Sequence, residues 1–320
     1  MKSLLKICFF ALLLAATSSP AQGQFNGANT LGDFGVLSGS QPGPGFYFSP
    51  FYYRYDVDDV IDGSGDAVDL LPSEDPANLS INAFAPILYW VSGKKVFGAN
   101  YGIMMAVPFA NTALAVPVLG TNVRTSFGIG DIYLRPVDLG WHTDRADYMT
   151  GLAVTMPTGR YGDPEEADVS LGMWSFEVFA GTSLYLDETH SWHLATTAFW
   201  ETHSTRKDTD ERVGDLLTFE GGVGKTLSAT GLTVGVAYYA QWKLTEDDFG
   251  AGFTPPAGVA IGKHRAYGVG PDITLPLATG SRLYGYLNAR YIWDVGTRTR
   301  TEGRGLSLTA TFPIPSVPLS

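Results

Sequence analysis

Long segments of strict two-residue alternation are the feature that most limits what this chain can fold into. In residues 232–244, every second side chain is apolar: Leu232, Val234, Val236, Tyr238, Ala240, Trp242 and Leu244. Alternate residues of a β-strand face opposite sides, so the pattern predicts a strand with one apolar face. Strands of soluble sheets usually have about 5–6 residues, whereas a tilted strand that crosses a bilayer needs about 9–11. The length of this segment therefore favours a membrane-spanning strand.

The same alternation recurs along the chain and predicts twelve strands in all. The other clear segments are residues 79–91, 96–107, 174–186, 192–202, 217–225, 267–275, 283–293 and 306–312, and weaker ones are 46–55, 127–141 and 148–157. Single-chain barrels of bacterial outer membranes have an even number of strands. The predicted fold class is therefore all-β, a transmembrane antiparallel β-barrel of 12 strands and bacterial outer-membrane type.

The predicted connections alternate between short and long. The short ones are residues 92–95, 142–147, 187–190, 228–231 and 278–281, and the longer polar ones are 56–77, 109–125, 160–171, 203–214, 245–262 and 294–303. Outer-membrane barrels have short periplasmic turns and longer extracellular loops. The alternation thus supports the barrel and predicts which end of each strand faces the cell exterior.

Residues 1–21 have the features of a secretory signal. Lys2 and Lys6 form a basic start, residues 7–16 are apolar but too few to span a bilayer, and Ser19-Pro20-Ala21 offers a small-residue cleavage site. We therefore expect a cleaved signal peptide, export, and residence in a bacterial outer membrane.

The remaining chain divides by pattern into three parts. Residues 22–44 are polar and rich in glycine, and we expect either a flexible periplasmic lead or a plug folded into the lumen. Residues 45–314 form the predicted barrel, and 315–320 a C-terminal tail. The single cysteine, Cys8, lies within the signal, so the exported chain has no thiol for a disulfide or for cysteine-ligated zinc.

The tryptophans lie near the predicted strand ends. Amphipathic indoles prefer the membrane interface, so we predict two interfacial girdles. Their members are Trp141, Trp174, Trp192, Trp200, Trp242 and Trp293. Trp90 also adjoins a predicted short turn, but its position in the alternation predicts an inward side chain.

The positions opposite the apolar face are predicted to line the lumen. The candidates for solute contact are Arg135, Glu177, Glu201, Glu220, Tyr239, Lys243, Tyr284, Tyr286 and Arg290. Charged groups at bilayer depth need water or a partner, so a hydrated or hydrogen-bonded interior follows. Each of these residues could instead belong to a salt-bridged interior that fills a narrow barrel.

Other functions find little support in the sequence. With 32 acidic against 21 basic residues and a net charge of −11, a nucleic-acid partner is not expected. The acidic residues 56–69 lack the order of a calcium loop and are predicted to form a solvated loop, so no metal or cofactor is expected. The neighbours His203 and Ser204, and likewise His190 and Ser191, would face opposite sides of a strand. We therefore expect no catalytic residues and no enzymatic activity.

Four short motifs resemble a known family. They are Pro157-Thr158-Gly159-Arg160-Tyr161, residues 171–177 (LGMWSFE), residues 219–225 (FEGGVGK) and residues 236–247 (VAYYAQWKLTED). In order and spacing, over residues 45–312, they are similar to the outer-membrane transporter family named for the MetA (meta-cleavage) pathway of phenol degradation.

The resemblance implies a β-barrel channel in a Gram-negative outer membrane for passive or facilitated uptake of small hydrophobic or aromatic compounds. Its implied partners are outer-membrane lipid, the solute and the barrel assembly machinery. Two alternatives remain open at this point. One is a soluble secreted β-barrel binding protein, and the other is an outer-membrane barrel with a structural or lipid-hydrolase role.

Overall fold

The computed structural model describes residues 26–67, 78–116, 121–162, 168–250, 262–280 and 282–314. Within these ranges, no helix is long and apolar enough to cross a membrane. The strands are β1 Gly45–Ile61, β2 Asn78–Val96, β3 Ala99–Ala106, β4 Phe109–Val116, β5 Thr121–Arg124, β6 Gly128–Ile129, β7 Ile132–His142, β8 Ala146–Met156, β9 Ser175–Tyr185, β10 Trp192–His203, β11 Leu216–Thr226, β12 Thr233–Lys243, β13 Arg265–Thr279, β14 Arg282–Arg298 and β15 Arg300–Ile314.

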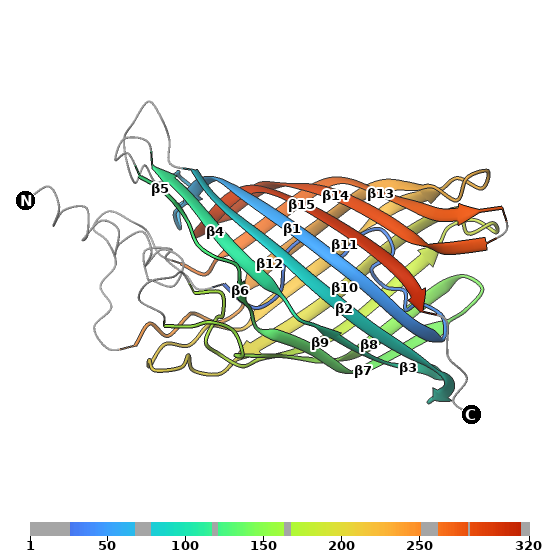
Figure 1. The fold of residues 1–320 in the computed structure, drawn as a ribbon, viewed down its shortest axis with the longest axis horizontal. Coiled ribbons are helices and arrows are strands. Elements are labelled where there is room, and N and C mark those ends of the chain that lie inside the picture. The colour runs from blue at the N-terminus through green and yellow to red at the C-terminus, as the bar shows by residue number, and fades with distance from the viewer. Residues whose placement is uncertain are drawn as a thin grey trace, which may run out of the picture.

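The strands form one closed antiparallel barrel (Figure 1). Strand β1 pairs with β2 on one side and with β15 on the other, which closes the sheet. Strands β3 and β4 pair with successive parts of β2 on either side of Pro108, and proline cannot donate to a ladder. If β3 and β4 count as one strand, and the short β5 and β6 are left aside, the wall has 12 strands, which confirms the predicted fold class.

The outer surface of the barrel is apolar and its inner surface is polar. In β12, Val234 and Val236 are exposed, whereas Ala237 and Tyr239 are buried. Similar exposed positions lie on other strands: Leu88, Leu152, Phe176, Val178, Leu194, Val223, Ile273, Leu287 and Leu308. A continuous apolar exterior around a polar interior fits a barrel in lipid and does not fit the soluble binding protein considered above.

Two predicted loops are largely strand. The predicted loop 294–303 is wrong, because β14 runs to Arg298 and β15 starts at Arg300, with Thr299 alone between them at a φ of 54°. The predicted loop 109–125 is also wrong in its first half, where β4 pairs with β2.

The acidic segment 56–69 is likewise not a single solvated loop. Strand β1 continues to Ile61, and Asp56 forms a salt bridge with Arg54 at 2.6 Å. Beyond the strand, one carboxylate oxygen of Asp62 accepts the backbone N–H groups of three residues in the following turn. Residues 68–77 lie outside the described residues. Strands β1, β14 and β15 are longer than a strand needs to be to cross a bilayer. In the part of each strand that lies beyond the bilayer, polar side chains no longer alternate with apolar ones.

One predicted short turn is displaced along the chain. Residues 92–95 belong to β2, and the turn between β2 and β3 consists of Phe97 and Gly98, both with positive φ. Two positive φ values match the two-residue hairpin turn that fits the twist of antiparallel strands. The register between β2 and β3 shifts in this region, where Asn100 donates a hydrogen bond to the carbonyl of Ser92. This irregularity explains why the Ser-Gly-Lys-Lys sequence resembles a turn.

Candidate functional site

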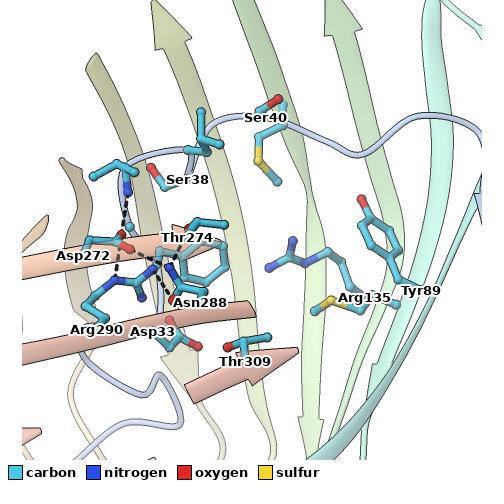
Figure 2. Close-up of a pocket in the computed structure, with 16 residues that line it drawn as sticks. Asp33, Ser38, Ser40, Tyr89, Arg135, Asp272, Thr274, Asn288, Arg290 and Thr309 are labelled. Carbon is cyan, nitrogen blue, oxygen red and sulfur yellow. Dashed lines mark hydrogen bonds and ion pairs between the residues drawn. The ribbon is translucent and has the colours of Figure 1, made fainter. Parts of the chain in front are cut away.

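The candidate site is the barrel lumen and the segment that precedes β1. We name residues 26–44 the luminal segment, because its side chains and backbone contact the inner wall. Leu31 packs against Ala237, Tyr239, Ala266 and Ile292. Phe34 packs against the ring of Phe199, with the ring centroids 4.9 Å apart. Figure 2 shows this segment crossing the barrel interior beside the wall strands.

Three wall carboxylates accept hydrogen bonds from the backbone of the luminal segment. Glu201 on β10 accepts the N–H groups of Ala28, at 2.6 Å, and Asn29, at 3.2 Å. Glu220 on β11 accepts the N–H of Phe34 at 3.0 Å, and Asp272 on β13 accepts that of Val36 at 3.1 Å. A buried backbone outside regular structure needs such partners, and hydrogen bonds to charged groups each contribute about 1.5–3 kcal/mol.

The segment continues towards the opposite end of the barrel. Thr197 donates from its hydroxyl to the carbonyl of Ser38 at 2.9 Å, and Gln41 donates from its amide to the carboxylate of Asp138 at 3.0 Å. A Cβ on Gly39 would overlap the backbone of Thr182, so this position admits glycine alone. The contacts therefore extend from the end of β10, at Glu201, to Asp138 in the second half of β7.

Two arginines of the wall form salt bridges with wall aspartates. Arg290 forms a salt bridge with Asp272 at 3.0 Å, and Arg135 with Asp138 at 3.3 Å. The Arg135 guanidinium also lies 4.1 Å from the ring centroid of Phe179. These pairs satisfy the requirement for partners that buried charges impose.

The sequence-predicted lumen residues fall into two groups. Those buried in the barrel are Arg135, Glu177, Glu201, Glu220, Tyr239, Lys243 and Arg290. Tyr284 and Tyr286 are instead 45% and 43% exposed and lie near the beginning of β14. Tyr286 is paired with Thr311 across the ladder, two residues beyond the cavity-lining Thr309. The structure therefore buries the first group inside the barrel, where Glu201, Glu220 and Arg290 contact the luminal segment, and leaves the two tyrosines near the strand end.

A cavity of about 310 Å³ lies between the luminal segment and the wall (Figure 2). Its lining combines apolar and polar side chains with the backbone of the segment. The lining residues are Asp33, Phe34, Gly35, Val36, Leu37, Ser38, Ser40, Tyr89, Met104, Arg135, Met149, Asp272, Thr274, Asn288, Arg290 and Thr309. The sequence analysis left open whether residues 22–44 enter the lumen, and it did not predict that residues 33–40 line a cavity, because they carry no periodic pattern.

Buried carboxylates also hold connecting segments at one end of the barrel, among them residues 157–162, 168–174, 204–215 and 244–250. Asp131 accepts the N–H groups of Gly159, at 3.0 Å, and Leu171, at 2.8 Å. Asp247 accepts the N–H of Gly214 at 2.7 Å and pairs with the predicted lumen residue Lys243 at 2.5 Å. Lys243 thus helps to hold Asp247 in place within a loop, and it does not line the cavity described above.

Five of the predicted girdle tryptophans lie at or near a strand end, and Trp293 lies within β14, five residues before Arg298. Their inner-facing neighbours in sequence are buried, so the indoles point outwards. Four are exposed, namely Trp174, Trp192, Trp200 and Trp293, and Trp141 and Trp242 are partly exposed. The inward prediction for Trp90 is wrong: its neighbour Tyr89 lines the cavity, so Trp90 faces the opposite side of β2.

The two His-Ser neighbours do not form hydrolase-like pairs. The His203 ring contacts the carboxylate of Glu201, and the Ser204 hydroxyl accepts the N–H of Trp174. The His190 ring stacks on Tyr185, and Ser191 donates to Asp187 at 2.7 Å. The hydrogen bonds of Asp187 with Thr189, Trp192 and Ser191 hold its pKa below the usual range, in a turn outside the strands. These contacts give the residues structural roles.

A solved outer-membrane channel shares this fold. An outer membrane channel from Pseudomonas putida F1, described as a COG4313 channel, aligns with a TM-score of 0.69 at 14% identity, covering 89% of this chain and 100% of that chain. The beta domain of the Bordetella autotransporter BrkA aligns with a TM-score of 0.46 at 13% identity, covering 85% of this chain and 100% of that one. No curated protein matches the chain.

A family model described as "Putative MetA-pathway of phenol degradation" matches residues 58–310. The match spans most of the barrel and includes all four motifs discussed above. The protein therefore belongs to this family of putative MetA-pathway phenol-degradation proteins.

Proposed function

We propose that this protein is an outer-membrane channel for the passive or facilitated uptake of small hydrophobic or aromatic compounds, without catalysis. Its family and its apolar exterior support residence in a bacterial outer membrane. In this proposal residues 1–21 are a cleaved export signal, and the barrel assembly machinery inserts the chain.

The observation that carries the proposal is the mixed lining of the luminal cavity. Phe34, Met104 and Met149 offer apolar contacts, while Tyr89 and Asn288 add polar ones. Ligand sites are commonly concave and apolar with a few placed polar groups. Both arginines that line the cavity are already paired with aspartates, so they provide few places for a strongly hydrated solute. The lining therefore suits small solutes with an apolar body.

The luminal segment restricts the passage and is held without covalent links. Its attachments are hydrogen bonds and apolar contacts, and the mature chain has no cysteine. Such contacts can break and re-form, so we propose that displacement of the segment widens the route past the cavity. Large hydrophilic solutes would be excluded while the segment is in place.

The test compares uptake of ¹⁴C-labelled toluene by the native host, by a strain in which the gene is deleted, and by the complemented strain. Purified protein is examined in parallel by single-channel recording in planar bilayers. The proposal predicts slower initial uptake in the deletion strain, full recovery on complementation, and a small measurable conductance. Equal uptake by the three strains, absence of conductance and measurable esterase turnover would instead indicate an enzyme.

A further inference from the structure

The luminal segment is fastened to one side of the barrel. Between Ala28 and Gln41, its hydrogen bonds to the wall involve strands β7, β8, β10, β11, β13 and β14. Among the described residues, none of these bonds involves β1 or β15, which pair with each other where the barrel closes (Figure 1). A solute that moves along β1 therefore has no hydrogen bond between segment and wall to break.

Aromatic residues occupy inward positions of β1. Tyr47 lies opposite Tyr89, and Phe51 lies opposite Thr309, in the antiparallel ladders with β2 and β15. Directly opposed residues share one face of a sheet, and both of these partners line the luminal cavity. Tyr47 and Phe51 therefore face the lumen, as do the other aromatic residues at alternate positions of the strand. The aromatic row, as we name it, consists of Tyr47, Phe51, Tyr53 and Tyr55.

The two middle rings of the aromatic row are within reach of a solute. Phe51 and Tyr53 face the interior and are nevertheless partly exposed. Their ring planes are nearly parallel, at 13°, with the centroids 6.3 Å apart. The Tyr53 ring lies beside Gly305 on β15, where an added Cβ would come within 3.2 Å of the Tyr53 hydroxyl. Because Gly305 has no side chain, it leaves room for this ring against the wall.

Hydrogen bonds hold the two ends of the aromatic row. Tyr47, near the start of β1, donates to the carbonyl of Gly43 at 2.8 Å. Tyr55, towards the end of the barrel with the longer loops, donates to Asp294 at 2.7 Å, and Asp294 also accepts the hydroxyl of Tyr239. The row therefore extends from beside the cavity towards the extracellular end, with both terminal side chains fixed.

We infer that the aromatic row is a binding track for aromatic solutes, and that Phe51 and Tyr53 make the channel prefer an aromatic hydrocarbon to a saturated one of equal size. The inference rests on the proposed function, because it names the residues that select the solute of the same channel. Paired aromatic rings stabilise each other beyond the burial of their apolar area. A saturated ring of the same size gains only the burial.

The spacing of the row suits transport. Conduction requires sites that bind strongly enough for a solute to enter and weakly enough for it to leave, and several weak sites in series meet both conditions. Phe51 is paired across the ladder with the cavity-lining Thr309, and Tyr53 follows two residues later on the same face. A ring that leaves Tyr53 therefore meets Phe51 and then the cavity.

The test compares the initial uptake of ¹⁴C-labelled toluene and methylcyclohexane, which have the same number of carbon atoms and similar shapes. For each hydrocarbon, uptake by the deletion strain is subtracted from uptake by the complemented strain, at equal amounts of folded barrel. Phe51→Leu combined with Tyr53→Leu removes both rings and keeps apolar side chains. Tyr53→Phe keeps the ring and removes only the hydroxyl.

The matched control lies on the other face of the same strand. Phe48 and Tyr52 are paired with Leu88 and Leu308, whose side chains are exposed on the outside of the barrel. Phe48→Leu combined with Tyr52→Leu therefore removes one phenylalanine ring and one tyrosine ring from the lipid-facing surface. This double variant should keep the wild-type ratio of toluene uptake to methylcyclohexane uptake.

The expected wild-type ratio is at least threefold in favour of toluene. The inner double leucine variant should lower the ratio to near one, mainly by slowing toluene, whereas Tyr53→Phe should keep it. A wild-type ratio near one would overturn the inference without recourse to any variant. A wild-type ratio in the inner double leucine variant, or an equal fall in the outer one, would overturn it as well.

The two uptake measurements also separate this inference from the proposed function. If both hydrocarbons enter through the protein at equal rates, the aromatic preference is refuted and the channel function stands. If neither uptake depends on the protein, the proposed function itself fails, and the inference fails with it.

Discussion

Removal of the Glu201 carboxylate should release the luminal segment from the wall. Glu201 accepts the N–H groups of Ala28 and Asn29, and no alanine side chain can replace those acceptors. At the lower limit of about 1.5 kcal/mol for each charge-assisted hydrogen bond, the loss of two costs about 3 kcal/mol. Because each 1.4 kcal/mol is tenfold in an equilibrium constant, Glu201→Ala should raise the displaced population roughly 150-fold.

The displaced population can be measured by cysteine labelling, because the mature chain has no cysteine of its own. Ala237 is fully buried and packs against Leu31, so a cysteine at this position is protected while the segment is seated. When closing is fast relative to labelling, the rate reports the open fraction. In protein that carries Ala237→Cys, the further change Glu201→Ala should accelerate the reaction of this cysteine with a water-soluble methanethiosulfonate reagent roughly 150-fold.

Two further variants serve as controls for this experiment. Glu246→Ala removes an exposed carboxylate and should leave the labelling rate of the Ala237→Cys parent unchanged. Glu201→Gln retains an acceptor oxygen and should give an intermediate rate. A rate for Glu201→Ala within threefold of the parent would show that these hydrogen bonds do not hold the segment, and would refute the reasoning.

Two other substitutions test the seating of the segment and the lipid-facing surface. Gly39→Val should raise single-channel conductance, because a Cβ at this position overlaps the backbone of Thr182. Gly43→Val should not raise it, because a Cβ at Gly43 would meet only the Tyr47 hydroxyl, at 4.0 Å. Equal conductance of the two variants would contradict the placement of Gly39. Leu152→Arg, in the middle of β8 and facing outwards, should destabilise the barrel by about 2–4 kcal/mol, and Leu184→Arg, near the end of β9, by about 0–1 kcal/mol. Urea unfolding in lipid bilayers measures both, and equal losses would argue against the assigned bilayer position.

The barrel could be predicted from the sequence because lipid and lumen impose opposite polarities on the two faces of every strand. Residues 233–243 show this constraint directly, and β12 has those bounds. Where strands leave the bilayer the constraint ends, so β14 and β15 around Thr299 resemble a loop in composition although they are paired. The pattern thus identifies the membrane-spanning part of a strand and misplaces its ends.

The candidate site could be predicted in part. Glu201, Glu220 and Arg290 fall on inward positions of alternating segments, so their burial follows from the same pattern. Their hydrogen-bond partners in the luminal segment could not be predicted. The backbone of this segment is hydrogen-bonded to side chains far away in the sequence and not to a neighbouring strand. One local signal was present: Gly39 lies in a short glycine- and serine-rich stretch, which is consistent with close approach of two backbones.

The most direct test of the central claim is whether solute passes through this cavity. Thr309 lines the cavity, whereas its neighbour Leu308 is exposed on the outer face of β15. Thr309→Trp should fill the cavity and reduce the initial uptake of labelled toluene at least fivefold in the complemented deletion strain, at equal amounts of folded barrel. Leu308→Trp adds the same ring on the outside and should leave uptake within twofold of wild type. Wild-type uptake by Thr309→Trp would contradict passage through the cavity.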